Sequence, residues 1–70
     1  MYNNEIVKER IKNKATEQGR SVRSVLMSCN INTSYLAQLD GNKGMTAAYL
    51  YRIADELECS TDYLLGRSDN

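Results

Sequence analysis

The chain has 70 residues, which is one small domain with a modest hydrophobic core. This length excludes a barrel enzyme, a two-domain cleft and a dinucleotide-binding enzyme of the usual size. Hydrophobic residues make up 41% and charged residues 26%, without a single proline, which favours a compact helical domain over a disordered chain. Nine basic residues balance nine acidic ones, but residues 1–45 carry a net charge of +3 and residues 46–70 a net charge of −3.

Residues that carry enzyme chemistry are scarce. The chain has no histidine, and Gly41 and Gly44 do not have the spacing of a phosphate-binding loop. Cys29 and Cys59 are too few for a disulfide framework and, without histidine, a poor basis for a zinc site; we interpret both as core side chains in a reducing compartment. No apolar stretch approaches the length of a membrane span. We therefore expect a cytoplasmic protein that is not an enzyme, with no cofactor, metal, membrane contact or small-molecule substrate.

Hydrophobic periodicity predicts two helices in the first part of the chain. The first covers residues 4–18, and Gly19 stands where its C-cap belongs. The second covers residues 22–29, with Ser21 as its N-cap and Asn30 tolerant of the left-handed conformation that a tight turn requires. The apolar positions with helical spacing are Val7, Ile11 and Ala15 in the first helix and Val22, Val25, Leu26 and Cys29 in the second.

A third helix is predicted over residues 33–40. Asn32 is its expected N-cap, which makes Ile31 and Leu36 a hydrophobic staple. Leu36 and Leu39 are expected to face inward. The opposite side of this helix is small or polar and consists of Thr33, Ser34, Ala37 and Gln38.

Two more helices complete the predicted domain. Thr46 caps the helix over residues 47–57, whose apolar stripe has the same spacing as that of the second helix. Ser60 caps a final short helix over residues 61–65, which Gly66 ends. No segment alternates with a period of two for long enough to form a strand. The sequence therefore predicts an all-α fold, a compact bundle of five short helices.

The second and third predicted helices are separated only by residues 30–32, a connection typical of a helix-turn-helix. The outward side of the later helix carries Thr33, Ser34 and Gln38, which suit hydrogen bonds and methyl contacts at base edges in the major groove. Arg23, Asn42 and Lys43 flank it and suit phosphate contacts, as do the amides that begin the second helix. This combination predicts binding to double-stranded DNA.

Two stretches resemble a known family. Residues 21–43, SVRSVLMSCNINTSYLAQLDGNK, look like the helix-turn-helix of the Cro/phage-repressor-type (XRE) transcriptional regulators. The run YLYRIADELECSTDYLLGRSDN resembles the ending common in that family. The resemblance implies a single lambda-repressor-like DNA-binding domain over residues 1–70, with its helix-turn-helix at about residues 21–40. It also implies a repressor of phage or mobile-element type that binds operator DNA as a dimer.

The resemblance also assigns roles to individual residues. Base contacts fall on Thr33, Ser34 and Gln38. Phosphate contacts fall on Ser21, Val22, Asn32, Tyr35, Asn42, Lys43 and Thr46, in addition to the phosphate contact already expected of Arg23. The chain departs from the family pattern at several positions, namely Ala15, Val22, Leu26, Asn30 and Met45. Many members of the family carry at position 15 an Arg that pairs with an acidic residue at position 40. Because this chain has Ala15 there, we expect Asp40 to lie exposed or to pair with another residue.

One recognition helix touches too few base pairs to select a site in a genome, so we expect a homodimer. The expected dimer surface is formed by Tyr63, Leu64 and Leu65, because a helix this short cannot bury so much apolar area alone. We expect one of the two leucines to enter the core of its own chain instead. The alternative function is a helix-turn-helix module that binds protein, in an antitoxin or anti-repressor role. An affinity for DNA that falls steeply with salt distinguishes the two functions.

Overall fold

The structure is a computed structural model that describes residues 4–38 and 45–67. The described residues form helices and connections, with no strand among them. The helices in chain order are α1 (Asn4–Glu17), α2 (Val22–Ser28), α3 (Tyr35–Gln38), α4 (Ala47–Leu57) and α5 (Thr61–Leu64). The predicted all-α class is confirmed for this part of the chain, and α1, α2, α4 and α5 begin at the predicted residues.

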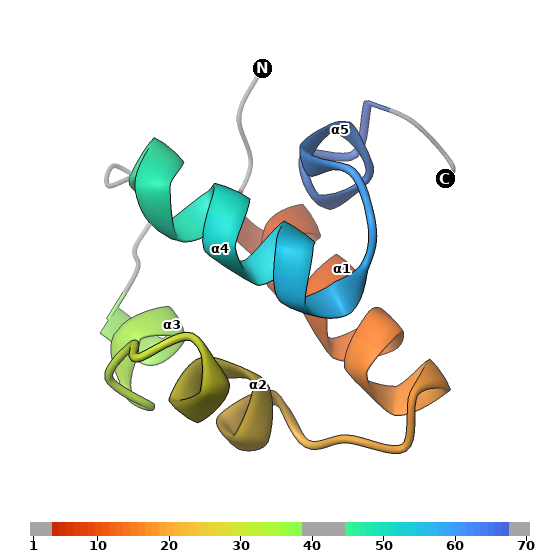
Figure 1. Ribbon diagram of the computed structural model, residues 1–70. Coiled ribbons are helices and arrows are strands. Elements are labelled where there is room, and N and C mark those ends of the chain that lie inside the picture. The colour runs from red at the N-terminus through yellow and green to blue at the C-terminus, as the bar shows by residue number, and fades with distance from the viewer. Residues whose placement is uncertain (1–3, 39–44, 68–70) are drawn as a thin grey trace.

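Helices α1, α2 and α4 pack against one another, and α5 packs against α1 and α4 (Figure 1). In Figure 1, α4 crosses in front of α1, while α2 and α3 lie together below α4. The side chains between these helices form one core, in which Val7, Ile11, Val25, Ile53 and Leu64 have no exposed surface. The predicted stripes of α1, α2 and α4 therefore face a common interior, with Val22 and Cys29 half-buried at its edge.

Hydroxyl side chains begin three of the helices. Ser21 Oγ accepts a hydrogen bond from the Ser24 amide at 3.1 Å, and Ser60 Oγ accepts one from the Tyr63 amide at 3.0 Å. Thr46 Oγ1 accepts one from the Tyr49 amide at 3.4 Å. Each oxygen satisfies an amide that has no partner within its helix, so three of the four predicted N-caps, Ser21, Thr46 and Ser60, are confirmed.

Four helices end in the same left-handed turn. The residues that adopt it are Gly19, Asn30, Glu58 and Gly66, with φ between +57° and +79°. At Asn30, the amide bonds to the Met27 carbonyl at 3.1 Å, and the Ile31 amide bonds to the Leu26 carbonyl at 2.9 Å. This pair of bonds is a Schellman motif, and it satisfies carbonyls that the helix itself leaves open. Glu58 is unusual in this conformation, because glutamate has a Cβ, unlike glycine, and lacks the short polar side chain with which asparagine stabilises it.

The predicted start of the third helix is wrong by two residues. Residues 33 and 34 form a turn, and α3 begins at Tyr35. The Asn32 side-chain oxygen accepts a hydrogen bond from the Ser34 amide at 2.9 Å, an Asx-turn bond that orders residues 32–34 before regular helix begins. Leu39 and Asp40 lie outside the described residues.

Polar contacts tie distant parts of the chain together. Gln18 Nε2 donates to the Leu57 carbonyl at 2.7 Å, which joins the end of α1 to the end of α4. Arg20 pairs with Glu56 of α4 at 2.9 Å and donates to Ser28 Oγ of α2 at 3.1 Å. A single guanidinium therefore holds α2 against α4, beyond what apolar packing supplies.

The two cysteines are free and half-buried at the edge of the core. Burial raises the pKa of the Cys59 thiol, and burial together with the Glu56 carboxylate raises that of Cys29. The raised pKa keeps both thiols in the protonated form at neutral pH, which disfavours the nucleophilic thiolate. Within the described residues, no helix combines the length and the apolar character that crossing a membrane requires.

Candidate nucleic-acid interface

The connection between α2 and α3 is longer than the sequence predicted. It spans residues 29–34, whereas residues 30–32 were expected. Ile31 lies in the middle of this connection and is only 4% exposed, so it fixes the connection to the core. Asn30 and Asn32, the neighbours of Ile31 in the chain, are both exposed. The geometry is a short helix pair whose turn is anchored at one buried side chain.

The predicted base-contacting residues lie on the outside of the molecule where they are described. Thr33 and Ser34 are exposed, as is Ala37 on α3. Thr33 and Ser34 belong to the turn before α3, which corrects their predicted place on the helix. Gln38 is the last described residue of α3, and its side chain lies outside the described part of the structure.

Asn32 and Ser34 order the turn that presents Thr33. Besides the amide bond, Ser34 Oγ donates to Asn32 Oδ1 at 2.8 Å. The Asn32 side-chain oxygen thus accepts two hydrogen bonds from one residue. The Asn32 amide nitrogen is the group with which this side chain would donate to a phosphate, because phosphate oxygens only accept.

At the start of α2, the predicted phosphate ligands differ in what they offer. Ser21 is exposed; its hydroxyl oxygen accepts the bond that caps the helix, and its hydroxyl hydrogen can still donate to a phosphate. Val22 is half-buried against the core and its apolar side chain has no hydrogen-bond donor, so only its backbone amide can contact a phosphate. Arg23 is exposed and forms no ion pair with the described residues. Arg23 is therefore the strongest cation for a phosphate at this end of the interface.

Tyr35 is the first residue of α3 and Thr46 is the N-cap of α4, and the two residues lie against each other. The Thr46 amide donates to the Tyr35 hydroxyl oxygen at 3.3 Å. The ring of Tyr35 meets the ring of Tyr49 edge to face, with 4.9 Å between the centroids. Arg52 in turn lies 5.9 Å from the Tyr49 ring centroid. Asn42 and Lys43, the other predicted phosphate contacts, lie outside the described residues.

The predicted dimer residues are mostly buried in their own chain. Leu64 has no exposed surface and Tyr63 is 8% exposed, whereas Leu65 is half-buried. Arg10 and Lys14 of α1 cover the Tyr63 ring, at 4.5 and 5.1 Å from its centroid. The expectation that one leucine enters the core is confirmed for Leu64. Of the three side chains, only that of Leu65 offers substantial surface to a second copy.

Comparison with known proteins found no matching family model, no matching curated protein and no matching solved structure. The assignment of a surface to a function therefore depends on the chemistry of this chain.

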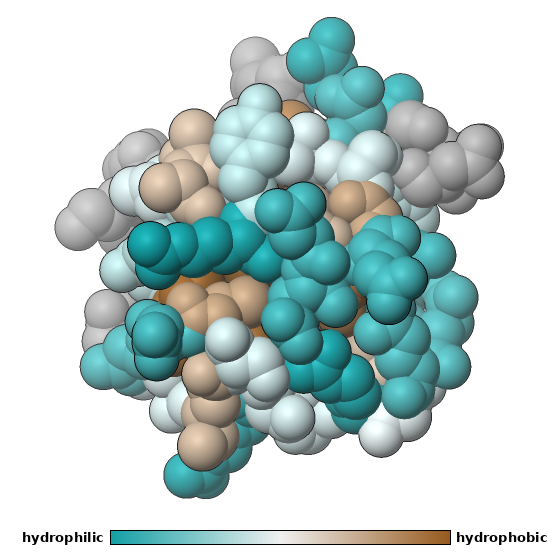
Figure 2. Space-filling view, in the orientation of Figure 1, coloured by the Kyte–Doolittle hydropathy of each residue, from teal (hydrophilic) through white to brown (hydrophobic). Residues whose placement is uncertain are grey.

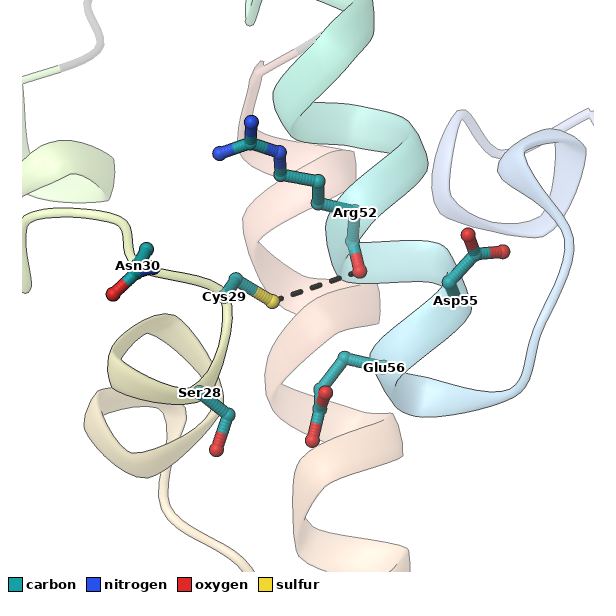
Figure 3. A pocket seen from close by; sticks show the side chains of 6 residues that line it. All are labelled: Ser28, Cys29, Asn30, Arg52, Asp55 and Glu56. Atoms are coloured by element: carbon teal, nitrogen blue, oxygen red, sulfur yellow. Dashed lines mark hydrogen bonds between the residues drawn. The ribbon is translucent and has the colours of Figure 1, made fainter.

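An open, polar pocket of about 430 Å³ lies between the end of α2 and α4. Its lining consists of Ser28, Cys29, Asn30, Arg52, Asp55 and Glu56. Figure 2 shows hydrophobic surface within the hollow between α4 and the α2–α3 pair, framed by hydrophilic side chains. In Figure 3 the Cys29 thiol points to α4 and donates to the Arg52 carbonyl at 3.6 Å, while the Arg52 and Asp55 side chains point in different directions. The charged groups do not converge on a common point, as a substrate site would require.

Metal-binding side chains are also dispersed. Across residues 4–38 and 45–67, no three His, Cys, Asp or Glu residues lie where they could hold a metal ion. The exposed polar side chains among the predicted contacts include Thr33 in the turn before α3, Arg23 in the first turn of α2 and Thr46 at the start of α4.

Four features of the structure around α2, α3 and the start of α4 were not predicted from the sequence. The Tyr35–Thr46 hydrogen bond and the Tyr35–Tyr49 ring contact join segments with no common pattern, so no local signal could have found them. The anchoring role of Arg20 was also missed, although its place directly before the Ser21 cap marked it as close to α2. Met45 is buried, and only its apolar character indicated this in advance.

Proposed function

We propose that this chain is a sequence-specific DNA-binding transcriptional regulator of the Cro/phage-repressor type. In this proposal α2 and α3 act as a helix-turn-helix in a lambda-repressor-like domain. The start of α3 enters the major groove of operator DNA, and two copies bind together. The chain acts as a repressor encoded by a phage or a mobile element.

The observation that carries the proposal is the exposure of Thr33, Ser34 and Ala37 on a turn and helix whose other side is anchored. Ile31 enters the core, and Tyr35 and Leu36 are half-buried against it. Small side chains with hydroxyl and methyl groups allow close approach to base edges. A rigid backing lets such contacts discriminate between bases, because a mobile helix would adapt to any sequence.

Charge supports the same surface. The described residues at the start of α2 and in the turn before α3 include Arg23 and no carboxylate. Among the described acidic residues of the second half of the chain, Asp55 and Glu56 line the pocket beside Asn30, whereas Glu58 lies at the C-terminal end of α4 and Asp62 lies on α5. Where a duplex contacts these two segments, it therefore meets Arg23 and polar groups.

The test is selection of bound fragments from a random pool of DNA duplexes, followed by titration of the selected fragment and a shuffled control of equal length. We expect the selected duplex to bind about a thousandfold tighter or more, and both affinities to fall steeply between 50 and 200 mM salt, because phosphate contacts release counterions. A pool with no enriched sequence and an affinity that does not respond to salt would contradict the proposal and favour a protein-binding module.

A further inference from the structure

Helix α3 has only four described residues, Tyr35–Gln38, so it cannot maintain its direction by its own backbone bonds. Its orientation must come from contacts with the rest of the molecule. Among its described side chains, Tyr35 and Leu36 are half-buried and Ala37 is exposed. Leu36 supplies apolar packing, which resists separation from the core but permits a small rotation. Tyr35 supplies a directed contact.

That contact has two parts, which together leave α3 little freedom to rotate. The Tyr35 hydroxyl oxygen accepts the Thr46 amide at 3.3 Å, and the Tyr35 ring packs edge to face on Tyr49. Thr46 is the N-cap of α4, an eleven-residue helix that is part of the core. We call this arrangement of Tyr35, Thr46 and Tyr49 the tyrosine clasp. It joins the first residue of α3 to the first turn of α4.

We propose that the tyrosine clasp sets the orientation of α3 and thereby the sequence selectivity of the interface. This inference rests on the proposed DNA-binding function and deepens it. Tyr35 then acts as a positioning residue, not as the phosphate ligand that the family resemblance implies. Discrimination between bases requires the hydrogen-bonding atoms to be placed within about half an ångström. A small rotation of α3 therefore weakens contacts to the correct bases more than contacts to phosphates.

The test uses Tyr35→Phe, which removes the hydroxyl oxygen and keeps the ring against Tyr49. The matched control is Tyr51→Phe, because Tyr51 is 63% exposed on α4 and outside the clasp. For the wild type and both variants, the dissociation constants for a selected duplex and for a shuffled duplex are measured at one salt concentration. Exchange of the Thr46 amide with deuterated solvent is measured on the same proteins without DNA.

We expect Tyr35→Phe to reduce the ratio of the two dissociation constants by about two- to tenfold, the worth of one neutral hydrogen bond. Affinity for the shuffled duplex should change less than twofold, and the Thr46 amide should exchange faster. Tyr51→Phe should match the wild type in all three measurements. A role limited to general stability would leave the ratio unchanged at a temperature where both variants are folded.

The outcomes separate the two proposals. If the wild type selects a sequence and Tyr35→Phe keeps the full ratio, the clasp does not set selectivity and the inference is wrong. If Thr46 exchange is unaffected by Tyr35→Phe, the hydrogen bond does not exist in solution and the inference is equally wrong. If the wild type selects no sequence at all, the proposed function itself fails, and the inference fails with it.

Discussion

Thr33 and Arg23 are both exposed, yet the proposed interface uses them differently. A threonine has no charge to attract phosphates, and it contributes by its methyl and hydroxyl groups at a base edge. An exposed arginine attracts any duplex through its phosphates, whatever the sequence. Substitution of each residue alone should therefore distinguish contacts to bases from contacts to the phosphate backbone.

We expect Thr33→Ala to relax base preference at one position of the binding site, at a cost of about 1–3 kcal/mol for the correct base. Arg23→Ala should weaken binding to all duplexes alike and lower the salt slope by about one unit. Titration of the selected duplex, its single-base variants and a shuffled duplex at several salt concentrations measures both effects. If Thr33→Ala weakens every duplex equally, Thr33 does not read a base.

Glu58 is strained at the end of α4. Its φ of +57° lies in the left-handed region, where a side chain with a Cβ costs about 1 kcal/mol relative to glycine. The Glu58 and Cys59 amides nevertheless bond to the Asp55 and Ala54 carbonyls at 3.1 and 3.0 Å. The hydrogen bonds of the Schellman motif therefore impose a conformation that this residue type disfavours.

Glu58→Gly should raise the free energy of unfolding by about 1 kcal/mol, because glycine adopts this conformation without steric cost. Glu58→Ala is the control, since it removes the same charge and retains the Cβ. Urea denaturation of the three proteins measures the difference. Equal stabilities for the glycine and alanine variants would show that the turn is not strained in solution.

At the scale of elements, local chemistry determined what the sequence could predict. Ser21, Thr46 and Ser60 mark helix starts because their hydroxyls act within three residues. The start of α3 was misplaced because Asn32 has two local options, a helix cap and a turn, and the structure has the turn. The left-handed turn at Glu58 was missed because glutamate gives no signal for it.

The relative placement of the elements depends on contacts that no periodicity reveals. Apolar stripes predicted that α1, α2 and α4 share a core, but not which polar groups connect them. Arg20 is the clearest case, because its guanidinium contacts both Ser28 and Glu56. Its side chain and that of Glu56 are about one-quarter and one-third exposed, so solvent weakens but does not remove this ion pair.

A double-mutant cycle tests this connection. We expect Arg20→Ala and Glu56→Ala each to destabilise the fold, with a coupling free energy of about 0.5–1 kcal/mol that declines with added salt. Arg20→Lys should restore only part of the loss, since an ammonium cannot bridge Ser28 and Glu56 with the same planar fork. Denaturation curves at low and high salt measure the coupling; a coupling of zero at both would mean that the pair adds nothing to the packing of α2 on α4.

At the scale of the whole molecule, the proposed interface lies far along the chain from the surface that the sequence assigned to dimer contacts. Tyr63 and Leu64 are buried in their own chain, which leaves Leu65 as the main apolar side chain of that set for a partner. Two copies with so small a shared apolar surface should associate weakly without DNA. Binding to adjacent half-sites would bring them together, because each copy raises the local concentration of the other.

We therefore expect the selected sequences to be two-fold symmetric, with half-site centres about 34 Å apart along the duplex. Sedimentation of the protein alone should show monomers at micromolar concentration, and the complex should contain two copies per duplex. Selected sites without symmetry, or a complex with one copy, would rule out the dimeric arrangement while leaving DNA binding by a single copy intact.

In the proposed function, the exposed turn before α3 contacts DNA. The most direct measurement follows the backbone amide resonances of the protein by NMR as a selected duplex is added. We expect the largest shifts at Thr33, Ser34 and Ala37, with smaller ones at Arg23 and Thr46 and little change at the end of α4. Shifts concentrated on α1 and α5, with Thr33 and Ser34 unmoved, would contradict it.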